Sequence, residues 1–532
     1  MSKNKIYYPL FLSLAVALGI FIGSMLDYPQ KSAALLFNTN PQEAKIKRLI
    51  NYIQYDYVDK VDTDSLLDGT IRNILGKLDP HSVYIPASEH DAIAETMNGE
   101  FVGVGIRFFM YNDSLTVTNV VKDGPSDKAG VEPGDRILIA NNDTLYGKNL
   151  MSNYIIKTFK GEPNTKVKIK VYRKYKDTLL NFTLKRGTIP LESVPSYYML
   201  TDTLGYIKID KFANKTYDEF KTALNTLKQK NMKRLVLDLR GNPGGYLGIA
   251  TQIVDEFLED DKLIVFTKNK GGKIDKTFAT SKGDFEKGQV YVLIDEVSAS
   301  ASEIVAGALQ DNDKGVIVGR RSFGKGLVQQ EMELGDGSAV RLTVSRYYTP
   351  TGRSIQKPYN TGNGQSYYND RITRYHNGEL TNFDSIKVVD SLKFVTPKGK
   401  NVYGGGGIVP DVFVSIDTTA YLGRFHFATM QDFVFEYVDN HREKMNTWTE
   451  GDFKQNFDDD GEILKEYLSL FDDESKISDI ITPHLKRYLK ALFARNLFDE
   501  NLFYQVLNNG DEMLKRVKEL EMQGNPVMSS DL

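Results

Sequence analysis

The chain has 532 residues, which is too long for one ordinary domain, and its 41% hydrophobic content is enough to fill several cores. A net charge of −3 at pH 7 gives no reason to expect a nucleic-acid partner. The sequence holds no cysteine, which excludes disulfides, thiolate metal sites, a cysteine nucleophile and a lipidated cysteine anchor.

The N-terminal segment predicts export. Lys3 and Lys5 precede an uncharged stretch from Ile6 to Met25. About 20 apolar residues can span a bilayer, and a basic flank before an apolar run also describes a signal peptide. We expect a signal anchor within 1–27, because the run is long for a signal peptide and no clear A-x-A site follows it; a cleaved signal peptide is the alternative. Either segment exports the remaining chain, and the positive-inside rule keeps the short N-terminal end in the cytoplasm.

An N-terminal helical region is expected over 42–98. Apolar residues from Ile46 to Ile53 recur at helical spacing, and a second helix is expected after a cap at Asp62 or Thr63. The segment LDPHSVY follows and contains His81. We interpret His81 as structural, because no cluster of partner residues surrounds it in the sequence.

Residues 99–187 change to strand-like runs separated by glycine-containing turns, the pattern of a small β domain. The order Gly103–Val104–Gly105–Ile106, followed by GPSDKAGVEPGDRIL, resembles a PDZ domain. Such domains capture a C-terminal carboxylate with backbone N–H groups and add the peptide as an extra strand. The resemblance implies that Gly103, Val104, Gly105 and Ile106 bind peptide. An unrelated β domain with ordinary turn glycines is the alternative.

The segment 188–414 alternates strands with helices, which implies an α/β layer with parallel strand pairing. Buried strands are expected at 205–209, 234–239, 291–294 and 315–319, with helices at 217–230, 246–258 and 303–312. The glycine turn 240–245 fits neither a dinucleotide fingerprint nor a P-loop, because both need other spacing. Residues 358–398 are polar and tyrosine-rich, and we interpret them as an insertion or lid-like loop without chemistry.

The serine-rich junction SASAS, at 298–302, is the candidate catalytic centre. A serine between a strand and a helix lies near exposed N–H groups and the positive end of a helix dipole, which stabilise an oxyanion. A nucleophilic serine needs a base, and no histidine occurs between residues 91 and 375. Lys325, flanked by Gly324 and Gly326, is the simpler candidate, since burial can lower a lysine pKa toward roughly 7–8.

Purely structural interpretations of the same residues remain possible from the sequence. Ser300 and Glu303 fit a capping box, S-x-x-E, and capping by itself would explain them. Lys325 alone would be a solvated surface lysine. Gln329 follows four residues later; if the piece is helical, it shares the face of Lys325 and holds the amine by a hydrogen bond. Spacing does not choose Ser300 over its serine neighbours.

The joint pattern closely resembles the carboxyl-terminal processing peptidases, also called tail-specific proteases: SASASEI, then Lys325 twenty-five residues after Ser300, then Gln329. The resemblance implies that Ser300 is the nucleophile, Lys325 the general base and Gln329 the residue that orients the lysine. The family's D-L-R-x-N-P-G-G turn implies an oxyanion hole made by an N–H of Gly244 or Gly245 together with that of Ala301. A turn needed only for packing is the alternative. The segments LDPHS, RYYTPTGRSIQ and GIVPD also match, so the resemblance covers about 43–413.

The expected fold class is α/β multidomain: an N-terminal helical region, a PDZ β domain, an α/β serine-peptidase core and a C-terminal helical region over 415–532. The expected function is an exported serine endopeptidase that recognises substrate C-termini, uses no metal or other cofactor, and acts on the periplasmic side of the inner membrane. Its expected partners are protein or peptide substrates and the membrane; a homo-oligomer stays open. The alternatives are a non-catalytic membrane-tethered PDZ scaffold and an acyl-transfer or thioester enzyme.

Overall fold

The computed structural model describes residues 41–147, 152–360, 362, 364–418, 422–458, 461–471 and 480–523, besides Ser13, Ala15, Val16 and Leu18. The predicted signal anchor at 1–27 falls almost wholly outside these residues. Among the helices that are described, none combines the length and the apolar character that crossing a bilayer requires. The chain divides into two compact units, Met1–Asn73 and Ile74–Leu532.

The two helices expected near the N-terminus are α2 (Pro41–Asp56) and α3 (Thr63–Gly76). Asp62 caps α3, because its Oδ1 accepts hydrogen bonds from the N–H groups of Asp64 and Ser65 at 3.1 and 3.2 Å. Helix α2 buries none of its residues. The second unit continues with β1 (Val83–Ile85) and α4 (Ala87–Asn98).

The expected small β domain follows, and its sheet has the antiparallel order β3-β4-β5-β7-β8, with β6 beside β5 and a separate β2-β9 pair. Leu115, Val117, Ile137 and Val171 are fully buried in its core. Its elements are β2 (Glu100–Gly103), β3 (Ile106–Tyr111), β4 (Ser114–Val120), α5 (Pro125–Ala129), β5 (Asp135–Ala140), β6 (Asp143–Thr144), α6 (Ser152–Phe159), β7 (Lys166–Arg173), η3 (Lys174–Lys176), β8 (Thr178–Lys185) and β9 (Gly187–Pro190).

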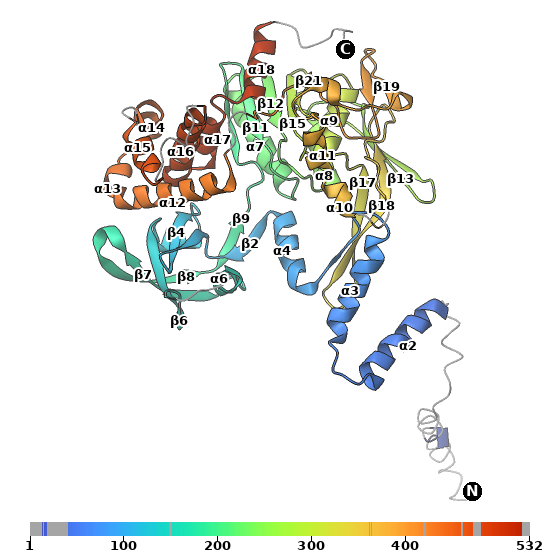
Figure 1. The fold of residues 1–532 in the computed structure, drawn as a ribbon, viewed down its shortest axis with the longest axis horizontal. Coiled ribbons are helices and arrows are strands. Elements are labelled where there is room, and N and C mark those ends of the chain that lie inside the picture. The colour runs from blue at the N-terminus through green and yellow to red at the C-terminus, as the bar shows by residue number, and fades with distance from the viewer. Residues whose placement is uncertain are drawn as a thin grey trace, which may run out of the picture. The chain divides into compact units, whose positions relative to one another are not determined.

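The central α/β layer has the strand order β10-β11-β12-β15-β16-β21, and its neighbours from β11 onward pair in parallel, as predicted. Helices α7, α8 and α9 cover one face, where Leu224, Val254 and Val305 join the core. Helix α18 (Glu512–Met522) covers the other face through Met513 and Val517 (Figure 1). The elements are β10 (Ser196–Met199), β11 (Leu204–Lys208), α7 (Thr216–Gln229), β12 (Arg234–Asp238), α8 (Leu247–Asp255), β15 (Gln289–Ile294), α9 (Ala301–Asp311), β16 (Gly315–Gly319) and β21 (Val412–Phe413).

A second sheet, β1-β18-β13-β14 with β17 on β18, brings distant segments together. Its further strands are β13 (Leu263–Asn269), β14 (Ile274–Phe278), β17 (Leu327–Glu333) and β18 (Ala339–Tyr348). Val83 of β1 pairs with Arg341, so the segment that contains His81 lies next to β18. The condition that the piece from Lys325 to Gln329 is helical is not met, because β17 directs its backbone hydrogen bonds to β18.

The predicted insertion 358–398 holds short elements, and its last strand pairs with β20. They are α10 (Gly364–Tyr368), α11 (Asp370–His376), η4 (Phe383–Ser385), η5 (Asp390–Leu392) and β19 (Lys393–Val395); β20 (Asn401–Tyr403) follows the insertion.

The C-terminal helices α12–α17 enclose a core of their own, as the expected helical region should. They are α12 (Arg424–Asn440), α13 (Arg442–Met445), α14 (Glu450–Asn456), α15 (Glu462–Leu468), α16 (Thr482–Leu497) and α17 (Glu500–Leu507). Asp439 of α12 pairs with Arg136 of the small β domain at 2.7 Å. Asn501 of α17 accepts a hydrogen bond from the hydroxyl of Ser196 in β10. These helices therefore contact both neighbouring domains.

Candidate active site

The three serines between β15 and α9 differ in what their hydroxyls bind. Ser298 Oγ donates to Leu239 O at 2.8 Å, and Ser302 Oγ donates to Asn242 O at 3.0 Å. Both side chains are fully buried. Ser300 is half-buried, and its hydroxyl donates no hydrogen bond to any of the described residues. Within the described part of the chain, Ser300 is therefore the serine of this run whose hydroxyl remains available, a choice that the spacing could not make.

Ser300 adopts an unusual backbone conformation, with φ +55° and ψ −112°, where the chain enters α9. Such a conformation costs energy for a residue with a Cβ and is found mainly at functional sites. Gly244 lies directly against it: a Cβ at Gly244 would stand 2.8 Å from Ser300 Cβ and 2.7 Å from Ala299 O. The turn after β12 can approach the serine only because glycine occupies this position.

The backbone N–H groups around Ser300 supply candidate donors for an oxyanion. Ala301 is the first residue of α9, so its N–H has no acceptor within the helix. The N–H of Gly244 donates to Asn242 Oδ1 at 2.8 Å. The N–H of Gly245 has no acceptor among the described residues. Of the two glycines predicted for the oxyanion hole, the structure therefore leaves Gly245 with a free donor.

Glu303, in the first turn of α9, connects the serine segment with the lysine segment. Its Oε2 accepts the N–H of Ser300 at 2.9 Å and the N–H of Lys325 at 2.8 Å. The Tyr347 hydroxyl lies 3.1 Å from Ser300 O and 2.6 Å from Lys325 O. The backbones at Ser300 and Lys325 are thus connected through one shared carboxylate oxygen and one shared hydroxyl group. Glu303 is the capping partner that the sequence suggests, but its link to Lys325 and the role of Tyr347 were not predicted.

Lys325 occupies the loop between β16 and β17, after Gly324, whose φ is +90°. Burial lowers the pKa of Lys325 to about 8; the charge of Arg341 acts in the same direction, and the carboxylates of Glu303 and Asp79 oppose it. No hydrogen bond among the described residues joins its amine to Ser300 or Gln329. A large fraction of this amine is unprotonated near pH 8, as a general base requires.

His81 lies in the same neighbourhood. Its Nε2 stands 3.1 Å from the Tyr367 hydroxyl. Burial and, after it, the charge of Lys325 lower the pKa of His81 to about 4, so the ring is neutral at pH 7. No group of three or more potential metal ligands occurs among the described residues. The buried, hydrogen-bonded ring fits the structural interpretation, although its position beside Lys325 was not foreseen.

Gln329 lies in β17, opposite Thr343 in the register of β18. Its Nε2 donates to Thr343 Oγ1 at 3.3 Å. The helical spacing that would bring Gln329 onto the Lys325 face is absent, so any contact with the amine has to come from the geometry of a strand.

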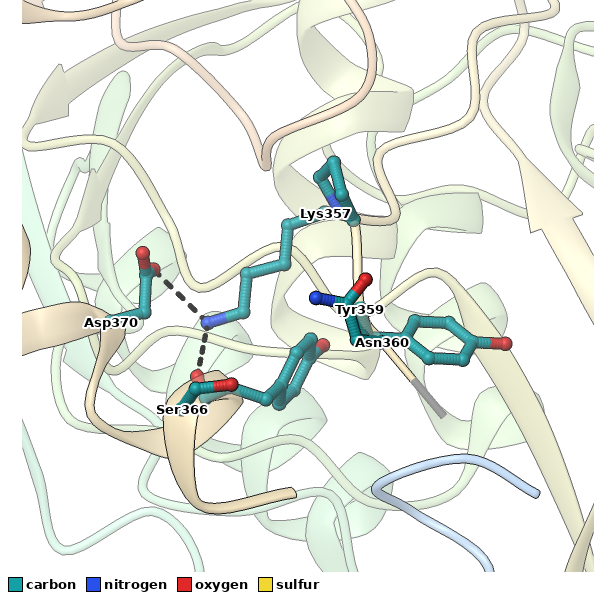
Figure 2. Close-up of a pocket in the computed structure, with 7 residues that line it drawn as sticks. Lys357, Tyr359, Asn360, Ser366 and Asp370 are labelled. Atoms are coloured by element: carbon teal, nitrogen blue, oxygen red, sulfur yellow. Dashed lines mark hydrogen bonds and ion pairs between the residues drawn. The ribbon is translucent and has the colours of Figure 1, made fainter. Parts of the chain in front are cut away.

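The insertion packs against the lysine loop, which its interpretation as a lid without chemistry did not predict. Arg374 of α11 donates to Ser322 O at 3.1 Å. Figure 2 shows a pocket beside Lys357, whose amine points toward Asp370. The pocket has a volume of about 140 Å³, and the Lys357 amine lies 3.1 Å from Asp370 Oδ2 and 3.1 Å from Tyr367 O. The pocket is lined by Lys357, Pro358, Tyr359, Asn360, Ser366, Tyr367 and Asp370.

The predicted peptide-binding residues form the passage from β2 to β3: Gly103 ends β2 and Ile106 starts β3. Gly105 takes a φ of +76°, and Val104 O accepts both the N–H and the hydroxyl of Ser126, at 3.1 and 2.7 Å. Among the described strands, β3 pairs only with β4. The other edge of β3 thus has no strand beside it, as strand addition by a peptide requires.

Comparisons with known proteins agree with this architecture. Peptidase family S41 matches residues 203–362, and a PDZ domain matches 102–185. The N-terminal domain of the activating protease CtpB matches 26–88, and a family of unknown function matches 427–499. A solved photosystem II D1 C-terminal processing protease is 24% identical, with 70% of this chain and 86% of that chain covered and a TM-score of 0.36.

Two curated relatives are similar to this chain, and the family follows from the second, which is covered over more than two thirds of its length. The carboxy-terminal processing protease CtpB of Bacillus subtilis (strain 168) is 35% identical over 316 residues, which are 59% of this chain and 65% of that protein. The carboxy-terminal-processing protease of Bartonella bacilliformis is 36% identical over 324 residues, 60% of this chain and 74% of that protein. The chain belongs to the carboxy-terminal processing proteases of peptidase family S41. This confirms the resemblance read from SASASEI and GPSDKAGVEPGD, the mixed α/β multidomain fold, and the expectation of a serine-type endopeptidase with a PDZ domain.

Proposed function

We propose that this S41 protease hydrolyses peptide bonds with Ser300 as nucleophile and Lys325 as general base. The observation that carries the proposal is the double connection of the two segments by Glu303 and Tyr347. Because both backbones are fixed in this way, only the side chains have to turn for the amine to reach the hydroxyl. Hydrogen bonds of this kind often tighten only when substrate is bound.

In the proposed reaction, unprotonated Lys325 takes the hydroxyl proton while Ser300 Oγ bonds to the scissile carbonyl carbon. The C–N bond then breaks, and Lys325 returns the proton to the leaving amine. Water attacks the acyl-enzyme and gives a proton to Lys325, which passes it to the departing Ser300 oxygen. Gln329 orients the lysine. No step needs a metal or another cofactor.

The oxyanion hole is assigned to the N–H groups of Ala301 and Gly245. Gly244 is the less suitable donor, because its N–H already donates to Asn242. Its part is to leave room for Ser300, whose Cβ a side chain at Gly244 would meet at 2.8 Å. Loss of one donor of an oxyanion hole typically raises the barrier by about 3–4 kcal/mol.

The substrate C-terminus is assigned to the loop Gly103–Ile106 and the edge of β3. The domain boundaries are assigned as the sequence predicts them: 42–98, 99–187, 188–414 and 415–532. The N-terminal segment 1–27 is assigned to export and to anchoring at the periplasmic side of the inner membrane. A basic flank followed by an uncharged run supports this part of the proposal.

A fluorophosphonate probe tests the nucleophile. The wild-type protein should gain the mass of one probe, and peptide mapping should place it on Ser300. The Ser300→Ala and Lys325→Ala variants should gain none at the same exposure and should cleave no unfolded protein substrate. Labelling and cleavage that persist in Ser300→Ala would move the nucleophile elsewhere; an unlabelled, inactive wild-type protein would favour a peptide-binding scaffold.

A further inference from the structure

A chain of hydrogen bonds holds the side chain of Gln329 from a distant part of the sequence. Gln329 Nε2 donates to Thr343 Oγ1 at 3.3 Å, and Thr343 Oγ1 donates to Asp79 Oδ1 at 3.0 Å. Ser82 fixes the other carboxylate oxygen by donating to Asp79 Oδ2 at 2.6 Å, and it accepts the N–H of Thr343 at 3.1 Å. Asp79 is buried. The segment before β1 therefore anchors a side chain in β17 through one residue of β18.

The direction of these bonds orients the Gln329 amide. An ionised carboxylate only accepts, so the single hydroxyl proton of Thr343 has to go to Asp79. The hydroxyl oxygen can then only accept from Gln329, which requires the NH₂ end of the amide to face Thr343. Oε1 is left at the opposite end, without a donor among the described residues.

The segment that carries Asp79 also borders the lysine loop: His81 Nε2 stands 3.1 Å from the Tyr367 hydroxyl, which lies 3.3 Å from Gly324 O, directly before Lys325. The charges of Asp79, Arg341 and Glu303 act on the Lys325 amine, and the charge of Lys325 in turn lowers the pKa of His81. Asp79 thus acts on the Lys325 amine through its charge and also binds Thr343, the register partner of Gln329. The Lys325 amine has no hydrogen-bond acceptor among the described residues, and its ammonium form would need one in this buried place.

We propose that Asp79 and Thr343 are positioning residues that lock the Gln329 amide with Oε1 toward Lys325, where it accepts a hydrogen bond from the ammonium formed during the reaction. The inference rests on the proposed roles of Ser300 and Lys325. It adds the segment before β1 to the machinery, through Thr343 and without any contact of Asp79 with substrate.

A matched pair of substitutions tests the relay. Thr343→Val keeps the branched shape in β18 and removes the hydroxyl, whereas Thr343→Ser keeps the hydroxyl. We expect Thr343→Val to lower kcat on a peptide substrate roughly tenfold to a hundredfold, as for loss of one hydrogen bond to a charged group. The acidic limb of the pH profile of kcat/KM for Thr343→Val should move to lower pH, because the charged form of Lys325 loses a hydrogen-bond acceptor. Thr343→Ser should restore both values, and thermal unfolding checks that all proteins are folded.

A double-mutant cycle supplies the second measurement. In a Gln329→Ala background, Thr343→Val should cause no further loss, since both changes remove the same orientation. Any of four results would overturn the relay. They are a wild-type kcat in Thr343→Val, equal losses of kcat in Thr343→Val and Thr343→Ser, an unshifted acidic limb in the pH profile of Thr343→Val, and additive losses of kcat in the double-mutant cycle. Failure of the proposed function would show separately, as wild-type activity that persists in Ser300→Ala.

Discussion

Glu303 Oε2 lies 2.8 Å from the backbone nitrogen of Lys325, although the two residues belong to a helix start and to a loop after another strand. The same oxygen accepts the N–H of Ser300. A side chain that would otherwise only cap α9 therefore sets the spacing between the proposed nucleophile and its base.

Glu303→Gln should remove most of the activity. The carboxylate accepts from Ser300, Ser322, Gly324 and Lys325, and the NH₂ end of a glutamine would face donors. We expect kcat/KM to fall about a hundredfold, because small displacements of catalytic groups have this effect. The unfolding free energy should fall by about 1–3 kcal/mol for an unsatisfied buried donor. Wild-type kcat/KM in this variant, measured on a peptide substrate, would contradict the connecting role.

The three serines should separate catalysis from stability. Ser300→Ala should lose all turnover and keep its unfolding free energy within about 0.5 kcal/mol, since the Ser300 hydroxyl donates no hydrogen bond to the described residues. Ser298→Ala should lose about 1–3 kcal/mol of unfolding free energy, because the N–H of Asp295 loses its acceptor and Leu239 O loses one of its two donors, and it should still turn over substrate. Chemical denaturation and peptide turnover measure both. Turnover by Ser300→Ala but not by Ser298→Ala would reverse the assignment.

Tyr347→Phe should act on kcat rather than on KM. The ring stays, but the carbonyl groups of Ser300 and Lys325 lose the hydroxyl between them. We expect kcat to fall about tenfold, the equivalent of one net hydrogen bond, with KM within about twofold. Steady-state kinetics on one peptide provides the test, and the opposite pattern, a raised KM at unchanged kcat, would place Tyr347 in substrate binding instead.

Substrate peptides should depend on a free C-terminal carboxylate. Amidation removes the group that the backbone of the Gly103–Ile106 loop is proposed to bind, so KM should rise for the amidated peptide. Gly105→Val should abolish the difference between the two peptides, because φ at Gly105 is +76° and a Cβ would meet Ile189 at 3.0 Å. Equal KM values for both peptides with the wild-type enzyme would argue against carboxylate recognition.

The local sequence was sufficient for the parallel pairing of the central strands, since the expected strands are short and apolar and a helix follows each of them except 315–319. It was also sufficient to place the cap at Asp62 or Thr63, because the hydrogen bonds of the cap span only residues 62 to 65; the structure assigns the cap to Asp62. The secondary structure at Gln329 was not predictable from the local sequence. Four-residue spacing suggested a helix, but pairing with β18 gave a strand.

Contacts across long separations account for what else was missed in the site. Tyr347 and Asp79 carry no signal of their own, because their partners lie far away in sequence. The segments that contain them matched the family, and that match was the one available clue. Likewise, only coordinates could show that the N–H of Gly244 is already occupied by Asn242 while that of Gly245 is not.

The pH dependence of kcat/KM tests the central claim most directly, namely that neutral Lys325 takes the proton of Ser300. Since the base has to be unprotonated and its pKa is lowered to about 8, activity should rise about tenfold per pH unit below that value and level off above it. Lys325→Ala should lack both the limb and the activity. A flat profile between about pH 6 and 9, or a wild-type limb retained in Lys325→Ala, would contradict the account.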